Sequence, residues 1–410
     1  MILTNQQLLF LMNKKMNIVS FNSLTVQVAL LLSFRLVTYS TTDTAFTARE
    51  KIDVSGFFDS SHHWYDIEDQ DKVIKPLQGQ RKYSPTAIDS IAANILLYQR
   101  ANGGWPKNYD MLAALTDEQV KAVLSVKGDT MGTTFDNGTT HSQVEYLARA
   151  FSLNHDVRYR DASLRGIDFI LSAQYRNGGW PQFYPDTSGY RKYITFNDDA
   201  MLGIMRVLYR INQNEPNYSF VDNARREKVR RAYEKGLSCI LKCQILEGGV
   251  LKAWGQQHDN LDFRPQSARN FEPACISSLE SASLVLFLMD IENPDSGLVN
   301  AINAAVRWFE KSKIPGTRLD IIKAPTTHFL YQTSSIDRVV VNDPGAPPIW
   351  TRFYELVTNR PMFCNRDKKV VYSLAEVERE RRVGYRWYEY DPALVLKRYP
   401  EWEKKWSPNK

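Results

Sequence analysis

The chain has 410 residues, of which 43% are hydrophobic and 24% are charged, a composition that is ordinary for a globular protein. Its formal net charge of +6 comes without a long run of Lys or Arg and without a groove-reading motif, which excludes the usual nucleic-acid-binding classes. The four cysteines are too few for a disulfide framework in a chain of this length, and their spacing is not that of a zinc site, so we expect core thiols.

The N-terminal segment, residues 1–40, resembles a secretory signal peptide. Lys14 and Lys15 precede a run from Val26 to Val37 that is apolar except for three residues. This run is shorter than the roughly 20 apolar residues that a membrane-spanning helix needs, so we expect no stable membrane insertion. We predict export to the periplasm or the extracellular medium, and the alternative is an irregular N-terminus without a targeting role. Removal of the segment takes away three cations and no acid, which lowers the net charge from +6 to +3 and is compatible with an anionic substrate.

Residues 41–84 are polar and irregular, and we predict no helix or strand there. From residue 88 onward, apolar residues recur at helical spacing, and several of these patterns run into loops rich in glycine. The sequence Asn-Gly-Gly-Trp-Pro occurs at residues 102–106 and 177–181, and a weaker form, Glu-Gly-Gly-Val, occurs at 247–250. Glycine suits the left-handed conformation that ends many helices. The predicted helices lie around residues 88–98, 144–151, 164–171, 201–211, 225–244, 276–289 and 302–309.

The glycine loops recur at intervals of 75 and 70 residues, measured from Gly103 to Gly178 and from Gly178 to Gly248. A period of this length fits two helices with their loops, so the repeat unit is a helical hairpin that stacks beside its neighbours. We therefore predict a mainly α-helical fold, a curved array or toroid of helical hairpins over residues 85–316. Residues 317–410 should form a smaller lobe, because residues 317–350 indicate short strands and proline-rich loops.

Two loops that each precede a predicted helix carry carboxylate and amide side chains. Asp136 and Asn137 lie before the helix near residue 144, and Asp198 lies before the helix near residue 201. Oxygen ligands at the ends of two helices suit a hard cation such as Ca²⁺, although the spacing is not that of an EF-hand. Each aspartate, taken singly, fits equally well as a helix cap or a first-turn charge. Because the loops belong to adjoining repeats, we predict that Asp136 and Asp198 meet in one groove.

Three arginines lie in polar, aromatic-containing loops of the C-terminal half. Arg269 lies in ARNFEP, Arg352 begins RFYELVTNRP, and Arg366 lies in NRD. A guanidinium group binds a carboxylate through two parallel hydrogen bonds, so these loops suit a substrate that carries carboxylates. A structural ion pair with a neighbouring acid is the competing interpretation.

The sequence resembles the family 10 polysaccharide lyases, the pectate lyases, in eight motifs that occur in the same order: NGGWPK, TTFDNGTTHSQ, NGGWPQFYP, FNDDAM, AWGQQHD, ARNFEP, RFYELVTNRP and NRD. The resemblance extends over residues 85–388 and implies an α/α toroid with a smaller lobe, an open groove and Ca²⁺-dependent β-elimination of polygalacturonate. Departures occur in the third Gly-Gly loop, which lacks its Trp, and near Asn270 and Cys364. They affect subsite shape and leave the candidate charged groups in place.

The resemblance also implies roles for individual residues. Arg269 would be the Brønsted base, Asp136 would share the catalytic centre with it, and Asp136 and Asp198 would bind Ca²⁺. A guanidinium group is normally protonated, so we expect burial beside Ca²⁺ and other cations to lower the pKa of Arg269. The residues that we expect to bind substrate are Asn137, Thr140, Trp254, Arg352 and Arg366.

Pectate lyase activity on polygalacturonate, by a monomer, is the favoured function. An α/α-toroid glycoside hydrolase is the first alternative, with Asp136 and Asp198 as its acid and base. A non-catalytic pectin-binding protein is the second. A lyase releases an unsaturated, ultraviolet-absorbing product and stops when calcium is chelated, whereas a hydrolase produces reducing ends without new absorbance.

Overall fold

The computed structural model describes residues 51–68 and 71–407, all within the second of two compact units of the chain, Arg49–Lys410. The predicted signal peptide, residues 1–40, lies outside the described residues. Within the described ranges, no helix is both long enough and apolar enough to cross a membrane.

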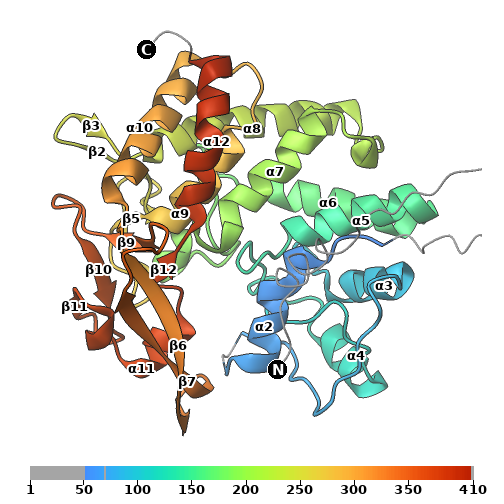
Figure 1. The fold of residues 1–410 in the computed structure, drawn as a ribbon. Coiled ribbons are helices and arrows are strands. Elements are labelled where there is room, and N and C mark those ends of the chain that lie inside the picture. Colours follow the sequence, from blue (N-terminus) through green and yellow to red (C-terminus); the bar gives the residue numbers. More distant parts are fainter. Residues whose placement is uncertain (1–50, 69–70, 408–410) are drawn as a thin grey trace, which may run out of the picture. The chain divides into compact units, whose positions relative to one another are not determined.

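Most of the helices form two packed layers (Figure 1). In one layer α5 contacts α7 and α7 contacts α9, and in the other α3, α6, α8 and α10 contact one another in that order. The layers meet where α5 packs on α6, α7 on α8 and α9 on α10, which is the arrangement of an α/α toroid and confirms the predicted fold class. The helices are α3 (Ile88–Tyr98), α4 (Asp117–Ser125), α5 (His141–Asn154), α6 (Val157–Ala173), α7 (Ala200–Asn212), α8 (Asn223–Cys243), α9 (Ser278–Leu288), α10 (Ser296–Ser312) and α12 (Asp391–Trp406).

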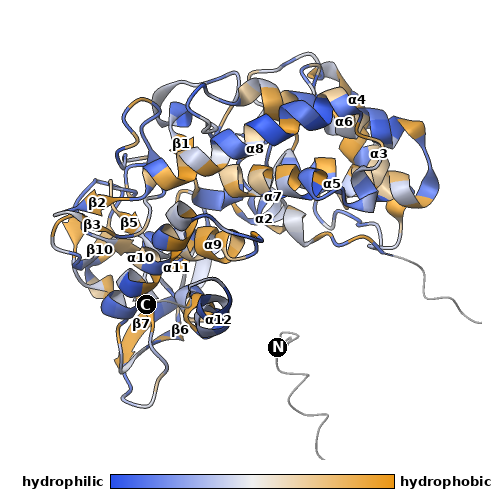
Figure 2. Ribbon diagram, turned by 90° about the horizontal axis from the view of Figure 1, so that it is seen from above, coloured by the Kyte–Doolittle hydropathy of each residue, from blue (hydrophilic) through white to orange (hydrophobic). Residues whose placement is uncertain are grey.

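Burial explains why the helices of the two layers differ in composition. Helix α9 is apolar on nearly every side because α7, α10 and α12 all pack against it. Figure 2 shows α9 mainly in orange, whereas α8 carries much more blue because one of its faces meets water. All four cysteines are buried and free, as expected for core thiols.

The repeated glycine loops are built alike, because equivalent residues make equivalent hydrogen bonds. The indole N–H of Trp105 donates to the carbonyl of Ile95 at 2.7 Å, and that of Trp180 donates to Ile170 at 2.8 Å. In each case a buried indole fills the space beneath the loop and satisfies a carbonyl near the end of the preceding helix. The first loop is also closed by Gly103, at φ 92°, where an added Cβ would lie 2.4 Å from a backbone oxygen of the next repeat.

A small antiparallel sheet joins the helical layers to the C-terminal part of the chain. Its strand order is β11-β10-β9-β5, and β5 runs directly into α9. The pairing of Ser277 with Phe353 therefore fixes Arg352 beside the start of α9, where the Ser278 N–H donates to the Arg352 carbonyl at 2.9 Å. The strands of this sheet are β5 (Ile276–Ser277), β9 (Phe353–Tyr354), β10 (Pro361–Cys364) and β11 (Val370–Val371).

The longest strands, β6 (Thr317–His328) and β7 (Thr333–Asn342), form one antiparallel hairpin. They fall where strands were predicted, although the prediction was of short ones. The register is regular from Thr317 to Lys323 and shifts before Thr327, where Pro325 has no N–H to donate to the ladder. Further two-stranded pairs are formed by β1 (Ile194–Thr195) with β4 (Gln257–His258), β2 (Leu246–Glu247) with β3 (Val250–Leu251), and β8 (Trp350–Thr351) with β12 (Tyr388–Glu389).

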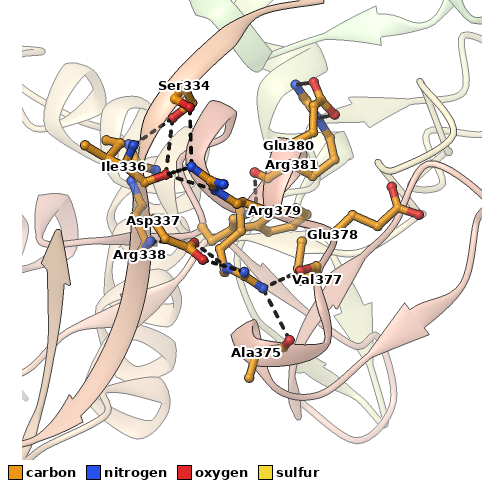
Figure 3. Close-up of polar contacts among 12 residues, drawn as sticks. Ser334, Ile336, Asp337, Arg338, Ala375, Val377, Glu378, Arg379, Glu380 and Arg381 are labelled. Carbon is orange, nitrogen blue, oxygen red and sulfur yellow. Dashed lines mark hydrogen bonds and ion pairs between the residues drawn. The ribbon is translucent and has the colours of Figure 1, made fainter. Parts of the chain in front are cut away.

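The hairpin is attached to the short helix α11 (Arg379–Gly384) by arginine side chains. Figure 3 shows the guanidinium of Arg379 directed at the backbone of Ser334 and Ile336, whose carbonyls accept from it at 3.0–3.3 Å. Arg382 forms two hydrogen bonds of 2.7 Å to Asp337. These contacts hold α11 in place, and α11 supplies charged residues to the candidate site described below.

The first described residues, 51–68, differ from the sequence-based prediction of an irregular segment. Residues 58–66, predicted to be irregular, form α2 (Phe58–Asp66) after a single turn of 3-10 helix, Ser55–Phe57. Trp64 is fully buried and donates to the Ile74 carbonyl at 2.7 Å, and Ser60 donates to the Tyr109 carbonyl at 2.9 Å. The helix is therefore stabilised by tertiary anchors, which a local hydrophobic pattern does not reveal.

Candidate active site

Two loops with the same backbone conformation hold the predicted aspartates. The Phe135 N–H donates to the Gln182 carbonyl at 3.0 Å, and the Phe196 N–H donates to the Gln256 carbonyl at 2.8 Å. Two residues further on, Asn137 and Asp198 both adopt the left-handed conformation, at φ 51° and 53°. In the loop before α5, Phe135-Asp136-Asn137, the carboxylate precedes the amide. In the loop before α7, Phe196-Asn197-Asp198, the amide precedes the carboxylate.

Asp136 and Asp198 line a single cavity of about 720 Å³, as predicted, although 62 residues separate them in the chain. Asn137 lines the same cavity, between the helical layers on one side and the sheet and α11 on the other. The acids that line it are Asp59, Asp71, Asp136 and Asp198, and the cations are Lys107, Arg269, Arg352, Arg366, Arg381 and Arg386. A cavity rich in cations around a few carboxylates suits an anionic ligand bound together with a metal ion.

Asp136 is held by the residues that follow the two Trp-Pro pairs. The Lys107 ammonium lies 2.7 Å from one carboxylate oxygen, and the Gln182 amide donates to the other at 2.9 Å. Burial acts to raise the pKa of Asp136, but the charge and hydrogen bond of Lys107 outweigh burial and lower this pKa to about 2. Asp136 is therefore ionised at any ordinary pH.

Asp198 is in the opposite electrostatic state. The Asn197 amide donates to its carboxylate at 2.8 Å, and Asp198 forms no ion pair with a cation of the described residues. Burial, followed by the negative charges of Asp136 and Asp59, raises the pKa of Asp198 to about 8. Both carboxylates therefore become ionised at neutral pH only when a further positive group lies between or beside them.

The donor atoms at this point of the cavity fit a calcium ion. Besides the two carboxylates, the amide oxygens of Gln182 and Asn197 are buried without a hydrogen-bond partner in the described structure. Carboxylate and amide oxygens are the ligands that Ca²⁺ prefers. The described residues contain no group of three or more His, Cys, Asp or Glu side chains placed to hold a metal, so a bound Ca²⁺ would need amide, water or substrate oxygens as well.

Each of the three predicted arginines forms an ion pair with a more deeply buried glutamate. Arg269 donates to both carboxylate oxygens of Glu272 at 2.8 and 2.6 Å, and Arg366 donates to Glu380 at 2.8 and 3.0 Å. Both pairs use Nε and one terminal nitrogen, which leaves the other terminal nitrogen directed elsewhere. The guanidinium groups line the cavity with their glutamates behind them, so they are oriented before any ligand binds.

Arg352 is more deeply buried than the other two arginines, with 6% of its side chain exposed. It forms an ion pair with Glu280 of α9, and its guanidinium lies 4.6 Å from the centre of the Tyr385 ring. Its Nε is buried without a hydrogen-bond partner in the described structure. A donor left unpaired at a cavity wall is costly, which favours a ligand oxygen at this position.

The ionisation of Arg269 differs from the sequence-based expectation. Burial acts to lower the pKa of Arg269, but the charge and hydrogen bonds of Glu272 outweigh burial, and the pKa lies well above its ordinary value. Asp198 contributes in the same direction. The paired Glu272 thus has a larger effect on the pKa of Arg269 than the neighbouring cations, which were the basis of the expectation.

Trp254 was assigned to substrate binding, and the structure places it in the core instead. It is fully buried, and its indole N–H donates to the Ile240 carbonyl at 2.7 Å. This is the bond that Trp105 and Trp180 make in the other repeats. The third glycine loop therefore does not lack its Trp, which only lies four residues further along because the loop is lengthened by the β2–β3 hairpin.

Thr140 was also assigned to substrate binding, and it too is fully buried. Its hydroxyl donates to the Thr134 carbonyl at 2.7 Å and accepts from the Trp105 N–H at 3.3 Å. It occupies the N-cap position of α5 at φ 68°, but its side chain makes no capping hydrogen bond. Thr140 thus ties the Asp136 loop to the first glycine loop and does not line the cavity.

Several cavity residues were not identified from the sequence. Lys107 and Gln182 each come directly after an NGGWP sequence. Their equivalent positions in the repeat could have predicted that both contact the same group. Gln256 stands at the corresponding place after Trp254, where its amide donates to Glu280 at 3.1 Å. Asp59 comes from α2, a helix that no local sequence pattern predicted.

Comparison with known proteins places these features in one family. The family model described as pectic acid lyase matches residues 99–396. Two solved structures of a family 10 polysaccharide lyase from Cellvibrio cellulosa, one of them a point mutant in complex with trigalacturonic acid, are each 29% identical to this chain. Each has a TM-score of 0.65 and covers 77% of this chain and 92% of its own. None of the curated proteins matches. With a family match over more than half of its length and a cavity of paired aspartates and arginines, the chain belongs to the pectic acid lyase family and is a polysaccharide lyase.

Proposed function

We propose that this polysaccharide lyase cleaves polygalacturonate by Ca²⁺-dependent β-elimination and releases unsaturated oligogalacturonides. The observation that carries the proposal is the meeting of Asp136 and Asp198 with Lys107 and three glutamate-backed arginines in one cavity. The trigalacturonic acid bound to the relative supports an anionic polysaccharide as substrate. We expect the enzyme to act as an exported monomer, with the toroid over residues 85–316 and the lobe over residues 317–410 completing the groove.

β-Elimination on a polyuronate begins with removal of the proton on the carbon beside the uronate carboxylate. The electron pair left behind forms a carbon–carbon double bond, the bond to the glycosidic oxygen breaks, and that oxygen takes up a proton as it leaves. The reaction consumes no water. Its barrier depends on how acidic the first proton is, so positive groups held against the uronate carboxylate stabilise the developing carbanion.

Arg352 and Arg366 are the proposed carboxylate ligands. The Arg366 guanidinium stacks on the Tyr331 ring, 4.3 Å from the ring centre, while its Nε and one terminal nitrogen donate to Glu380. A planar guanidinium that is held in this way presents two parallel donors to a carboxylate without further loss of side-chain freedom. Asn137 also lines the cavity and is proposed to bind substrate hydroxyl or carboxylate oxygens.

Asp136 and Asp198 are the proposed calcium ligands, supported by their position and by the unpaired amide oxygens beside them. When bound, Ca²⁺ would neutralise the uronate carboxylate and make the neighbouring proton more acidic. Lys107 keeps Asp136 ionised and oriented even without the metal, because the ammonium and carboxylate are both nearly buried.

Arg269 is the proposed proton acceptor, and its pairing with Glu272 sets the conditions for that role. A guanidinium must lose a proton before it can accept one, and Glu272 opposes this loss. The proposal therefore requires alkaline conditions and the positive charges of the loaded site. The alternative role is a third carboxylate ligand, in which Arg269 stays protonated throughout.

One observation favours the hydrolase alternative in part. The pKa values of Asp136 and Asp198, about 2 and about 8, differ in the way that those of a catalytic base and acid do. Family membership and the arginines around the cavity favour elimination. Incubation with polygalacturonate decides between the two: a lyase produces ultraviolet absorbance that appears with Ca²⁺ and stops with a chelator, and reducing ends without absorbance would overturn the proposal. Retention on polygalacturonate with no turnover at any calcium concentration would identify a binding protein instead.

A further inference from the structure

Glu389 of β12 is a buried carboxyl group to which the proposed function assigns no role. Its side chain is 0% exposed, and its Oε2 is buried without a hydrogen-bond partner in the described structure. The Arg386 Nε lies 3.7 Å from this oxygen, which is too far for a hydrogen bond. Buried ionised carboxylates are normally paired and hydrogen-bonded, so the surroundings of the other oxygen, Oε1, decide which protonation state fits.

The hydrogen bonds of the Ser278 hydroxyl indicate that Glu389 carries a proton. The Ser278 Oγ lies 2.8 Å from the Thr351 carbonyl oxygen and 2.5 Å from the Glu389 Oε1. A serine hydroxyl has one hydrogen, and a carbonyl oxygen has none to donate. Both contacts are hydrogen bonds only when Ser278 donates to Thr351 and a neutral Glu389 donates to Ser278. In the alternative, Ser278 donates to an ionised Glu389 and the Thr351 carbonyl faces a lone pair, which is unfavourable for a buried group.

The charges around Glu389 favour the neutral acid as well. The titratable and charged groups on the elements packed around it are Glu280 of α9, Arg352 after β8, Tyr354 of β9, Arg386 before β12 and Asp391 at the start of α12. Burial, followed by the charge of Glu280, raises the pKa of Glu389 to about 8. The two arginines oppose this shift without outweighing it, and each already pairs with another carboxylate, Arg352 with Glu280 and Arg386 with Asp391.

Ser278 connects Glu389 to the backbone of Arg352, a proposed uronate ligand. The Ser278 N–H donates to the Arg352 carbonyl at 2.9 Å, and its hydroxyl bonds to the preceding carbonyl, that of Thr351. One residue at the start of α9 thus holds two consecutive carbonyls. Ionisation of Glu389 would draw the Ser278 hydrogen away from Thr351 and would place a second anion beside Arg352 in addition to Glu280. Both changes weaken the hold of Arg352 on a uronate carboxylate.

We propose that Glu389 is a positioning residue that works as a neutral carboxylic acid: it donates its proton to Ser278, and it thereby holds Arg352 in place for a uronate carboxylate until alkaline pH removes that proton. The O–H bond of the acid then breaks, and the proton passes to hydroxide. The role toward the uronate rests on the proposed function, whereas the protonation of Glu389 does not. Because Arg269 as a base requires alkaline conditions, Glu389 would set the upper limit of that range.

The pH dependence of unfolding tests the protonation without any substrate. The pKa of Glu389 is raised from 4.5 to about 8, so its stabilising contribution is complete below pH 4.5 and is lost as the pH rises toward 8. Glu389→Gln keeps a neutral donor for Ser278 and cannot ionise. From about pH 5.5 to about pH 7.5, the unfolding constant of the parent should therefore rise roughly a hundredfold relative to that of the variant, tenfold per pH unit. A ratio that stays constant would show an ionised Glu389 and overturn the proposal.

Glu380→Gln is the matched control for the unfolding experiment. Glu380 is another glutamate with little exposure, 11%, and it pairs with arginines, but its pKa is lowered to about 2. Its contribution is lost only as the pH falls from 4.5 toward 2, so the control should show no trend over the higher range. If Glu389→Gln does not fold, the infrared C=O stretch of a protonated carboxyl, recorded in Ca²⁺ at pH 7, replaces the comparison. A band that shifts in Ser278→Ala supports the proposal, and identical spectra overturn it.

The positioning role is tested by KM and kcat for polygalacturonate in excess Ca²⁺ at pH 7 and pH 9.5. The KM of the parent should rise about threefold to tenfold more than that of Glu389→Gln, the range for a weakened charged contact, while kcat changes alike in both. An equal rise of KM in parent and variant would overturn the role. If the parent releases no unsaturated product, the proposed function fails. Calorimetric binding of trigalacturonate then gives the same comparison, and the unfolding experiment still decides the protonation of Glu389.

Discussion

The replacement of Lys107 by Met tests the electrostatic design of the site. Lys107 and Asp136 are both nearly buried, with 13% and 5% of their side chains exposed and 2.7 Å between ammonium and carboxylate. Removal of one partner leaves a buried charge unpaired, which costs about 3–5 kcal/mol of folding free energy. Lys107 also pairs with Asp71 at 3.2 Å. Because Asp71 is 40% exposed, loss of this second pair costs little folding free energy.

The cost of Lys107→Met should depend on pH with a definite sign. In the parent, the pKa of Asp136 is lowered from 3.8 to about 2, so Asp136 stabilises the fold above pH 3.8 and this contribution is lost as the pH falls toward 2. Without Lys107, burial raises the pKa of Asp136 above its unfolded value, and the carboxylate then opposes folding at neutral pH. The difference in unfolding free energy between parent and variant should therefore shrink as the pH falls from 7.5 to 4.5.

The assay is urea unfolding followed by circular dichroism at several pH values. Lys252→Met is the matched control, because Lys252 occupies the third glycine loop, is similarly buried at 16% exposure and pairs with Glu247 outside the cavity. We expect the control to cost less than Lys107→Met and to show no such pH trend, because Glu247 is 23% exposed and stays partly hydrated when Lys252 is removed. The double variant Lys107→Met with Asp136→Asn should recover much of the loss. Equal costs for the two lysine variants, or a gap that does not vary with pH, would show that Lys107 does not hold Asp136 in its charged form.

Three further predictions follow from single contacts. Glu272→Gln removes the charge that raises the pKa of Arg269, so if Arg269 is the base, the rising limb of the pH–rate profile should shift to lower pH, and an unmoved limb favours the carboxylate-ligand role. Arg366→Lys should lower kcat/KM for polygalacturonate about tenfold or more, because an ammonium cannot reproduce two parallel hydrogen bonds, and full activity would argue for a structural role. Trp254→Phe should lower the unfolding free energy by about 1–3 kcal/mol through loss of the hydrogen bond to Ile240 while KM stays unchanged, whereas a raised KM in a folded variant would restore the substrate-binding assignment.

The helical layers could be predicted from the sequence because they depend on local periodicity. The pattern from Ile88 to Tyr98 gives α3 with the bounds that the structure has. Helix α4 was missed although Thr116 and Gln119 form a capping box at its start, so a local signal was present in the sequence. Helix α2 had no such signal, because it is polar and depends on buried anchors such as Trp64.

The site could be predicted only where the sequence repeats itself or matches a family motif. The repeated loops placed Asp136 and Asp198 together, and they also contained Lys107, whose role was overlooked. The glutamates behind the arginines are harder to find, since Glu280 lies 72 residues from Arg352 and only the pairing of β5 with β9 brings them together. Long-range pairs of this kind decide the charge state of a site and are not visible in local patterns.

The mass of the products from trigalacturonate distinguishes elimination from hydrolysis. Elimination adds no water, so one fragment should be lighter by one water than the corresponding saturated galacturonide, and the two fragments together should equal the substrate in mass. We predict this result in the presence of Ca²⁺ and no fragments after chelation. Two saturated fragments, or cleavage that continues unchanged without calcium, would contradict it.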